Sequence, residues 1–393
     1  MSLNDTPKSE RIHIGFFGRR NAGKSSLVNK ITGQNLSVVS DVPGTTTDPV
    51  LKSMELLPLG PVTIIDTPGF DDEGVLGDLR VEKTKEILAK TDIAVLVVDG
   101  NAGVADTDKE LISLFEERKL PYITVYNKSD LKRVYGFSVS SETGEGIELL
   151  KQKIAQLKPD GERKQIVSDV LNEGSVVVLV TPIDEAAPKG RLILPQQQTI
   201  RDLLDAGNAA FVCREHELEK TLSSLKNPPD AVITDSQAFG FVSKLVPENV
   251  PLTSFSILFA RYKGVLESAV KGASVLDTLN DGDKILISEG CTHHRQCGDI
   301  GTVKLPAMIK KRTGKSFDFE FTSGGTFPED LSRFALVVLC GGCMLNEREM
   351  QTRLDRANSQ KIPMTNYGIL IAHINGILKR SLSLFPDILK ELP

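Results

Sequence analysis

The segment that most constrains the fold is residues 18–26, Gly-Arg-Arg-Asn-Ala-Gly-Lys-Ser-Ser, which follows an apolar run at residues 12–17. It matches the phosphate-loop pattern G-x-x-x-x-G-K-[ST], for which a preceding strand and a following helix are the expected context. Backbone amides of such a loop surround phosphate oxygens, and the helix N-terminus adds a favourable dipole. The alternative is a glycine-rich turn without a ligand. The pattern favours an α/β nucleotide-binding domain in which the phosphate-binding set is Asn21, Ala22, Gly23, Lys24, Ser25 and Ser26.

Downstream segments complete the predicted phosphate and metal site. Lys24 should reach the outer phosphates, and Ser25 should bind Mg²⁺. Thr46, in the hydroxyl-rich segment 44–48, can complete the Mg²⁺ shell when a γ-phosphate is present, although a plain threonine-rich turn is the alternative. After a predicted strand at 62–65, Asp66 can hold the metal through water, and the Gly69 amide can sense the γ-phosphate.

Another segment predicts the choice of base. A predicted strand at 122–126 leads directly into Asn127, Lys128 and Asp130. The Asp130 carboxylate can accept two hydrogen bonds from N1 and N2 of guanine, which adenine cannot donate, so an adenine nucleotide would leave it unpaired. Ser140 and Ser141, after a predicted short strand at 136–139, can close over the base through backbone amides.

Length and composition indicate the number of domains and argue against several classes of function. The 393 residues predict two or three domains, and 40% hydrophobic with 25% charged residues is an ordinary globular balance. A net charge of −5 without a long basic block argues against binding to nucleic acid or to an anionic membrane. No apolar run approaches the length of a membrane span, and the N-terminus has no signal-like core, so we expect a cytoplasmic protein.

The middle of the chain reads as a second α/β unit. A Pro/Gly/charge cluster at 158–162 suggests a boundary. Apolar strands are predicted at 175–180, 209–213 and 231–234, alternating with helices at 198–204 and 216–225. Segments 189–191 and 235–237 could form a pocket or an interface, but turns and a subunit contact are the favoured interpretation. Cys213 lies inside an apolar strand and is predicted to be a core residue.

Four of the five cysteines lie in the last third, a clustering that in a reducing compartment indicates metal binding or catalysis rather than disulfides. Predicted strands at 284–288 and 334–339 are followed by Cys291 and by Cys340-Gly-Gly-Cys343. If these strands are parallel neighbours, the three thiols converge at one edge of the sheet, where open α/β folds bind ligands. Three thiolates suit Zn²⁺ or an iron–sulfur cluster. The Gly-Gly pair, which lets amides approach sulfides, favours the cluster.

The nucleotide motifs, in their order and spacing, resemble the translation-factor-like class of small GTPases, particularly proteins similar to the tRNA-modification GTPase with its Asn-containing loop and Gly-Thr-Thr switch. In that group the loop asparagine, here Asn21, helps to coordinate K⁺, so the resemblance implies K⁺-activated hydrolysis with Lys24, Asn21 and Gly69 as the catalytic set. Phe70 follows Gly69, where other GTPases have a water-orienting glutamine, so intrinsic turnover should be slow.

With its Cys-x-His, forty-six intervening residues (294–339) and Cys-x-x-Cys, the whole chain resembles the HydF family, the maturation GTPase of FeFe hydrogenase. The resemblance implies an α/β protein of three domains: a P-loop GTPase domain (1–162), a dimerisation domain (163–265) and an iron–sulfur cluster domain (266–393). It implies a homodimer in which Cys291, Cys340 and Cys343 bind a [4Fe–4S] cluster that carries a transient di-iron precursor. The implied partners are the FeFe hydrogenase apoenzyme and the radical-SAM maturation enzymes.

The fourth cluster ligand and the overall function keep alternatives. Family members often have a histidine immediately before the Cys-x-x-Cys, where this chain has Leu339. Cys297 could occupy the fourth position because thiolate is the softer donor, with His293 and Asp299 as competitors, or Cys297 could be a free loop thiol. The alternative function is a ribosome- or tRNA-associated GTPase with a structural Zn²⁺ site.

Overall fold

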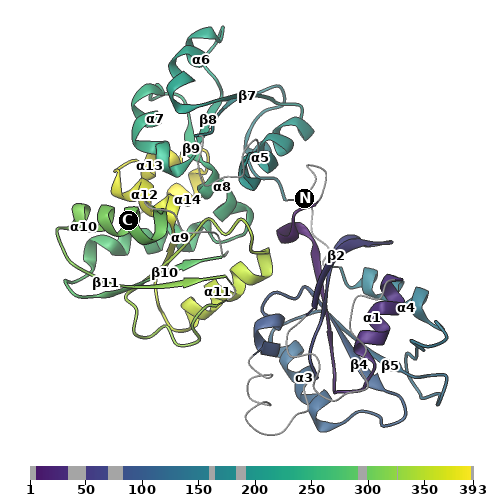
Figure 1. Cartoon of the computed structure of the whole chain (residues 1–393). Coiled ribbons are helices and arrows are strands. Elements are labelled where there is room, and N and C mark those ends of the chain that lie inside the picture. The colour runs from purple at the N-terminus through teal and green to yellow at the C-terminus, as the bar shows by residue number, and fades with distance from the viewer. Residues whose placement is uncertain are drawn as a thin grey trace. The chain divides into compact units, whose positions relative to one another are not determined.

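A computed structural model describes residues 6–33, 50–69, 83–158, 164–182, 192–290, 299–324 and 326–390. The chain forms two compact units, Met1–Gly161 and Glu162–Pro393 (Figure 1). Within these ranges no helix combines the length and apolar character that crossing a membrane requires.

The first unit is built on a five-stranded sheet in the order β2-β3-β1-β4-β5, in which only the β2–β3 pair is antiparallel. Its apolar runs form strands where the sequence predicts them, but the predicted strand at 136–139 is wrong, since only an isolated bridge joins Ser138 to Tyr126. The strands are β1 (Ile12–Phe17), β2 (Val50–Leu56), β3 (Gly60–Asp66), β4 (Ile93–Asp99) and β5 (Tyr122–Asn127).

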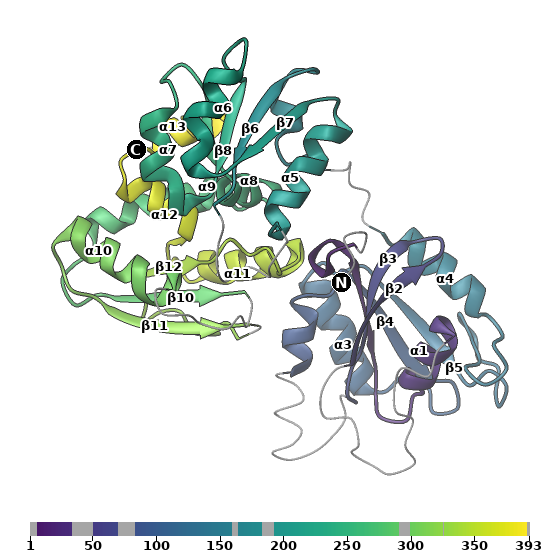
Figure 2. The same ribbon diagram turned by 45° about the horizontal axis from the view of Figure 1, so that its top comes forward.

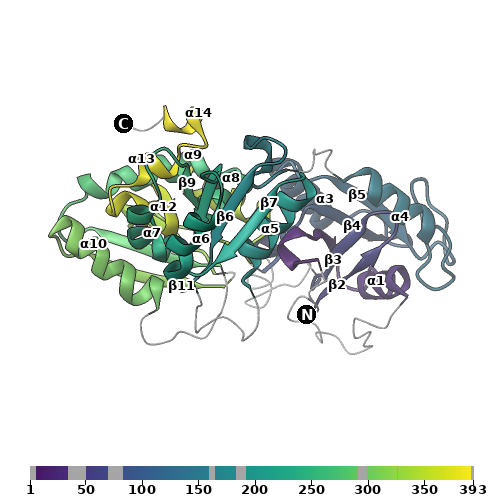
Figure 3. The same cartoon turned by 90° about the horizontal axis from the view of Figure 1, so that it is seen from above.

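Helices cover both faces of this sheet. On one face α1 (Lys24–Thr32) and α4 (Ile147–Gln156) pack side by side over one set of alternate strand residues (Figure 3). On the other face α3 (Asp106–Glu117) and helical residues 83–88 pack over the intervening set. The central strands β1, β3 and β4 are therefore buried on both sides, as expected for parallel strands that are covered on both faces.

The second unit contains two four-stranded parallel sheets. One runs β7-β6-β8-β9 and the other runs β11-β10-β12-β13. The strands of the first are β6 (Val176–Val180), β7 (Ala209–Cys213), β8 (Ala231–Thr234) and β9 (Leu252–Ser254). Those of the second are β10 (Lys284–Glu289), β11 (Asp318–Ser323), β12 (Leu336–Leu339) and β13 (Met364–Asn366).

The helices of this unit alternate with its strands. The predicted helix 198–204 is part of a longer helix α5, and the predicted helix 216–225 is a short 3₁₀ segment (Glu215–Glu217) followed by α6. The helices are α5 (Leu194–Asp205), α6 (Leu218–Ser224), α7 (Phe239–Leu245), α8 (Phe255–Tyr262), α9 (Leu266–Ser274), α10 (Leu305–Thr313), α11 (Glu347–Ser359), α12 (Tyr367–Ile374), α13 (Leu378–Ser381) and α14 (Pro386–Leu389).

The two sheets of the second unit are copies of one pattern. In both, the strand that is second in the chain lies at one edge, followed by the first, third and fourth strands. Segments 251–266 and 363–378, which contain β9–α8 and β13–α12, share Pro, Thr, Ile-Leu, Ala, Gly and Leu at the same spacing. An Ser or Asn side chain caps the helix in each copy: Ser254 accepts from the amide of Ile257, and Asn366 accepts from that of Ile369. Residues 166–385 thus contain an internal repeat.

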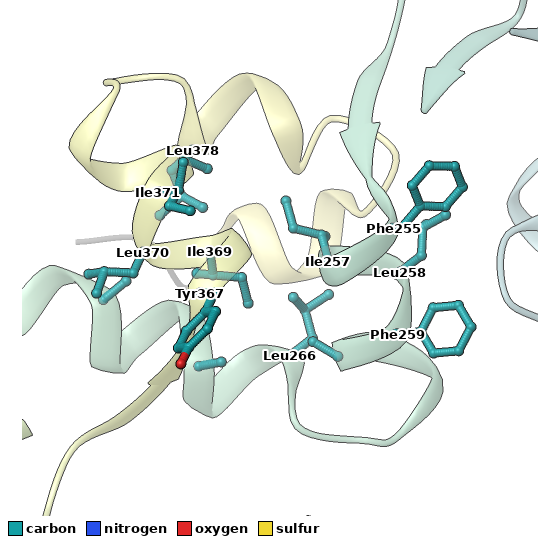
Figure 4. Packing of buried hydrophobic residues seen from close by; sticks show 14 of the residues in the cluster. Phe255, Ile257, Leu258, Phe259, Leu266, Tyr367, Ile369, Leu370, Ile371 and Leu378 are labelled. Atoms are coloured by element: carbon teal, nitrogen blue, oxygen red, sulfur yellow. The ribbon is translucent and has the colours of Figure 1, made fainter. Parts of the chain in front are cut away.

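The two repeats pack against each other through reciprocal contacts. Helix α9, which follows the first repeat, packs on β13, and α13, which follows the second, packs on β9. In Figure 2 α8, α9 and α12 lie between the two sheets, and Figure 4 shows their apolar side chains in one cluster. Because a single hydrophobic core runs through both repeats, they form one unit.

Candidate functional sites

The phosphate loop connects β1 to α1. Gly18 and Gly23 have φ angles of 139° and 86°, and Asn21, a residue type that tolerates the left-handed region, has 59°. A Cβ atom on Gly18 would lie 2.2 Å from the carbonyl oxygen of Val97, and one on Gly23 would lie 2.2 Å from Nδ2 of Asn127. Both glycines are therefore required by a close contact, with backbone at Gly18 and with a side chain at Gly23, as well as by conformation.

Lys24 begins helix α1 and is buried. Its ammonium donates to the carbonyl oxygens of Gly18 and Arg19, at 2.9 and 2.8 Å. The side chain thus folds back over its own loop, and its charge lies where the outer phosphates of a bound nucleotide would meet it.

Ser25 and Asp66 form the candidate Mg²⁺ site. Ser25 Oγ donates to Oδ2 of Asp66 at 2.6 Å, and Asp66 lies at the end of β3 with 1% exposure. Its other oxygen, Oδ1, has no hydrogen-bond partner among the described residues, so this buried carboxylate can still accept a cation or its water. A Cβ atom on Gly69 would lie 2.8 Å from the amide nitrogen of Arg20, so the Gly69 backbone contacts the phosphate loop. Thr46 is outside the described residues.

Asn127 joins the phosphate loop to the base-binding segment. Its Nδ2 donates to the carbonyl oxygen of Ala22 at 3.1 Å, and its Oδ1 accepts from the amide of Ser141 at 3.1 Å. Asp130 is exposed, and its Oδ1 accepts from Ser140 Oγ at 2.5 Å. Ser140 therefore fixes the orientation of the predicted guanine-reading carboxylate.

Lys128 forms an ion pair with Asp99, a residue that the sequence did not identify as part of the site. Its ammonium lies 2.7 Å from Oδ2 of Asp99, at the end of β4. Burial raises the pKa of Asp99, but the hydrogen bonds from Lys128 and from the Asn101 amide outweigh it and leave the pKa below the ordinary value. The pair holds the lysine in its left-handed conformation beside the base segment.

Arg19 is a second residue whose role the sequence did not reveal. Its Nε lies 3.1 Å from Oδ2 of Asp108, and its terminal nitrogen donates to the carbonyl oxygen of Gly103 at 2.7 Å. Asp108 is fully buried near the start of α3, where it also accepts from the amide of Ala105. The pair ties the phosphate loop to α3, and the sequence signal for it is a capping carboxylate at the start of that helix.

The predicted cysteine site lies at the carboxyl edge of the second sheet. Strands β10 and β12 are parallel neighbours, with Ser288 beside Leu339, so the predicted adjacency is confirmed. The chain leaves these two strands toward different sides, to β11 and to β13, which makes their junction the topological switch point of the sheet. Cys340 follows β12 directly, and Gly290, the residue before Cys291, follows β10.

Two backbone amides point at the sulfur of Cys340. The amides of Gly290 and Gly342 lie 3.1 and 3.4 Å from Cys340 Sγ, within hydrogen-bonding reach of sulfur. Cys340 and Cys343 carry free thiols. Burial raises the pKa of Cys343, a nearby charge on Cys340 raises it further, and the ammonium of Lys263 acts in the opposite direction. Free thiols with amide donors fit an iron–sulfur cluster, whose sulfurs accept such hydrogen bonds.

The rest of the predicted ligand set lies in segment 291–298, outside the described residues: Cys291, His293 and Cys297. Asp299 is described, and its Oδ2 accepts from the amide and the hydroxyl of Thr302, each at 2.9 Å. Across the described ranges, which omit that segment, no three His, Cys, Asp or Glu side chains group as a metal site.

A buried glutamate and a buried tyrosine lie in contact beside this edge of the sheet. Glu289 ends β10, and its Oε1 accepts from the hydroxyl of Tyr367 at 3.3 Å. Burial, followed by the charge of Glu289, raises the pKa of Tyr367 far above its ordinary value, so the phenol stays protonated. Tyr367 starts α12 and is labelled in Figure 4, where its hydroxyl points away from the apolar cluster.

Other sequence predictions for the second unit have mixed outcomes. Cys213 is part of the hydrophobic core, as predicted. Segment 235–237 forms a turn into a short 3₁₀ segment, which Asp235 caps by accepting from the amide of Gln237, and segment 189–191 is outside the described residues.

Comparison with known families assigns all three parts of the chain. Residues 13–128 match the family described as 50S ribosome-binding GTPase. Residues 166–264 match the hydrogen maturase F dimerization domain, and residues 267–384 match the hydrogen maturase F tetramerization domain.

Individual relatives match part of the chain. GTPase Der of Kosmotoga olearia is 37% identical over 129 residues, and the tRNA modification GTPase MnmE of Dechloromonas aromatica is 33% identical over 159 residues. These matches cover 32% and 37% of the chain, and they span only 29% and 35% of the relatives' own lengths. Among solved structures, Era of Aquifex aeolicus matches with 19% identity and a TM-score of 0.35, over 51% of this chain and 91% of that one.

Proposed function

Because the chain belongs to the HydF hydrogen maturase family, we propose that it is a maturation GTPase that also acts as an iron–sulfur scaffold. Its cargo would be the di-iron precursor of the active-site H-cluster, which it assembles or delivers to the FeFe hydrogenase apoenzyme after the radical-SAM maturation enzymes have acted. The alternative, a ribosome- or tRNA-associated GTPase with a structural Zn²⁺, is less well supported because hydrogen maturase matches extend from residue 166 to residue 384.

In this proposal the first unit binds and hydrolyses GTP. Ser25 and Asp66 hold Mg²⁺, with Thr46 completing its shell, and Lys24 neutralises charge on the outer phosphates. The Gly69 amide senses the γ-phosphate. Asn21 helps to coordinate an activating K⁺. Since Phe70 stands where a glutamine would orient water, turnover is slow.

The base is read by the segment after β5. Asp130 pairs with guanine, held in place by its 2.5 Å hydrogen bond from Ser140. Asn127 fixes the base segment to the phosphate loop, and Lys128 lies along the same segment. The amide of Ser141 donates to Oδ1 of Asn127, which fixes the segment at Ser141 to that side chain.

The second unit holds a [4Fe–4S] cluster through Cys291, Cys340 and Cys343, and when bound the cluster supplies an exchangeable iron site to which a cargo can attach. Cys297 or His293 is the fourth ligand, with Asp299 as a competitor. The observation that carries this proposal is the 3.1 Å contact between the Gly290 amide and Cys340 Sγ, because it brings the chain on both sides of the predicted site to one point.

Metal analysis tests the proposal. Protein purified without oxygen should be brown and contain iron and acid-labile sulfide, with a spin-resonance signal after reduction. Cys297→Ser and His293→Ala, compared in the same way, identify the fourth ligand by a change in that signal. A colourless protein with one Zn²⁺ per chain would instead support the ribosome- or tRNA-associated alternative.

We further propose that GTP hydrolysis times the docking or release of a partner rather than the cluster chemistry, because the nucleotide motifs and the thiols lie in different units. A Lys24→Ala variant should keep its cluster but transfer precursor to hydrogenase apoprotein more slowly. Transfer at the wild-type rate would refute this coupling.

The homodimer is proposed to form along β7. This strand is at the edge of its sheet, and Phe211 and Val212 are 43% and 47% exposed on it. An exposed apolar edge strand pairs readily with another chain. Phe211→Glu should shift the protein toward monomer in sedimentation experiments, whereas Phe241→Glu, at an equally exposed phenylalanine of α7, should not.

A further inference from the structure

Lys263 is a buried lysine whose partners lie in the cysteine loop. It follows α8 in the first repeat and is only 3% exposed. Its ammonium donates to the carbonyl oxygens of Gly342 and Leu345. Burial of a lysine is costly unless its donors are satisfied, and here two backbone carbonyls of the cysteine loop accept from its ammonium.

The position of Lys263 breaks the symmetry of the repeat. In the alignment of 251–266 with 363–378, Lys263 corresponds to Asn375. The neighbouring contacts are related: a Cβ atom added to Gly341 would lie 3.8 Å from Ser256 Oγ, and one added to Gly368 would lie 2.6 Å from Ser236 Oγ and 2.3 Å from Ser256 Cβ. The first repeat thus packs on the cysteine loop where the second packs on the loop after β8. A cation stands at this aligned position only in the first repeat, since Lys304 and Arg380 of the second repeat reach residues of the first from other elements.

We propose that Lys263 is a positioning residue of the cluster site, supplied by the first repeat to hold the Cys340–Cys343 loop and to place a positive charge beside its thiolates. This inference rests on the proposed function, because it requires a bound cluster. The region matched as a dimerization domain then has a second task, which is to complete the metal site of its neighbour in the chain.

Electrostatics define what the charge does. A cluster with thiolate ligands is anionic and gains negative charge on reduction, and net charge near the cluster sets its reduction potential. A charge removed from water acts more strongly than one on the surface. Lys263 should therefore favour the reduced cluster and slow the loss of iron. If its role were packing alone, an apolar side chain of similar length would serve equally well.

The test compares four anaerobically reconstituted full-length proteins: wild type, Lys263→Met, Lys263→Gln and Lys271→Met. Lys271→Met removes an equal charge from the surface of α9. We expect both Lys263 variants to make cluster reduction about tenfold less favourable, which is about 59 mV for one electron. We also expect them to lose iron to a chelator about tenfold faster, while Lys271→Met behaves as wild type. The glutamine variant still donates to a carbonyl, so it provides the potential if the methionine variant does not fold.

Each outcome is decisive. Equilibrium constants for cluster reduction and iron-loss rates within twofold of wild type in the Lys263 variants overturn the inference. A fall in melting temperature with an unchanged potential does so too, because it would indicate a structural role only. A wild-type protein that binds no iron or sulfide refutes the proposed cluster itself, so the two failures are distinguishable.

Discussion

The amide nitrogen of Gly290 lies 3.1 Å from Sγ of Cys340, although the two residues are fifty positions apart in the chain. The contact exists because β10 and β12 are neighbours that end at the same level of the sheet. It brings Gly290, the residue that precedes Cys291 in the sequence, to the Cys-x-x-Cys loop.

Replacement of Cys340 should abolish cluster binding. In Cys340→Ser the ligand set loses one soft donor, so we expect iron and sulfide to fall to less than about a tenth of the wild-type content. Cys213→Ser is the matched control. That thiol lies in the core of the first repeat, so the variant protein should retain its full iron content. Equal iron in the two variants would show that Cys340 is not a ligand.

Base selectivity should follow the carboxylate of Asp130. In Asp130→Asn the side chain donates where guanine also donates, so affinity for GTP should fall about a hundredfold or more, and xanthosine triphosphate should become the preferred nucleotide. Titration with fluorescent analogues of both nucleotides measures the exchange. Retained GTP affinity would mean that the base binds elsewhere.

The Arg19–Asp108 pair should stabilise the first unit. Arg19→Met leaves the fully buried Asp108 with the Ala105 amide as its remaining described partner, so the free energy of unfolding should fall by roughly 2–3 kcal/mol, and GTP should bind more weakly. Urea unfolding monitored through nucleotide binding tests both effects. Lys109→Met, which breaks an exposed pair with Asp106, should leave the unfolding midpoint unchanged.

The Asp99–Lys128 pair predicts a pH dependence. The folded state lowers the pKa of Asp99 below 3.8, so its contribution to stability is complete above that value and disappears as the pH falls through the folded pKa. Lys128→Met should therefore be less stable than wild type at pH 7, by about 1 kcal/mol, and this difference should shrink as the pH falls below 3.8. A difference that persists in strong acid would assign the effect to packing of the lysine stem.

The sequence predicted the functional residues that directly follow a continuous apolar strand. The buried strands of both units are continuous apolar runs, and the phosphate loop, Asp66 and Asn127 follow such runs directly, which is why their positions could be predicted. Strands β9 and β13 have three residues each, and β2 is a half-exposed strand at a sheet edge, so neither length nor pattern indicates them.

Partners that lie far apart in the chain could not be predicted. Nothing near Lys263 in the sequence indicates that its ammonium contacts carbonyls about eighty positions away. The repeat did leave a signal, since segments 251–266 and 363–378 are visibly related when placed side by side, and this comparison would have indicated that the two sheets share one topology.

The exchange of α9 and α13 between the repeats has a consequence for dissection of the protein. A fragment that stops after residue 264 would expose the apolar side chains of Ile257, Leu258 and Phe259 to water and lack the α13 cover of β9. Expression of either half alone should therefore give aggregates, and stable truncations should be sought only by removing residues 1–161 as a block.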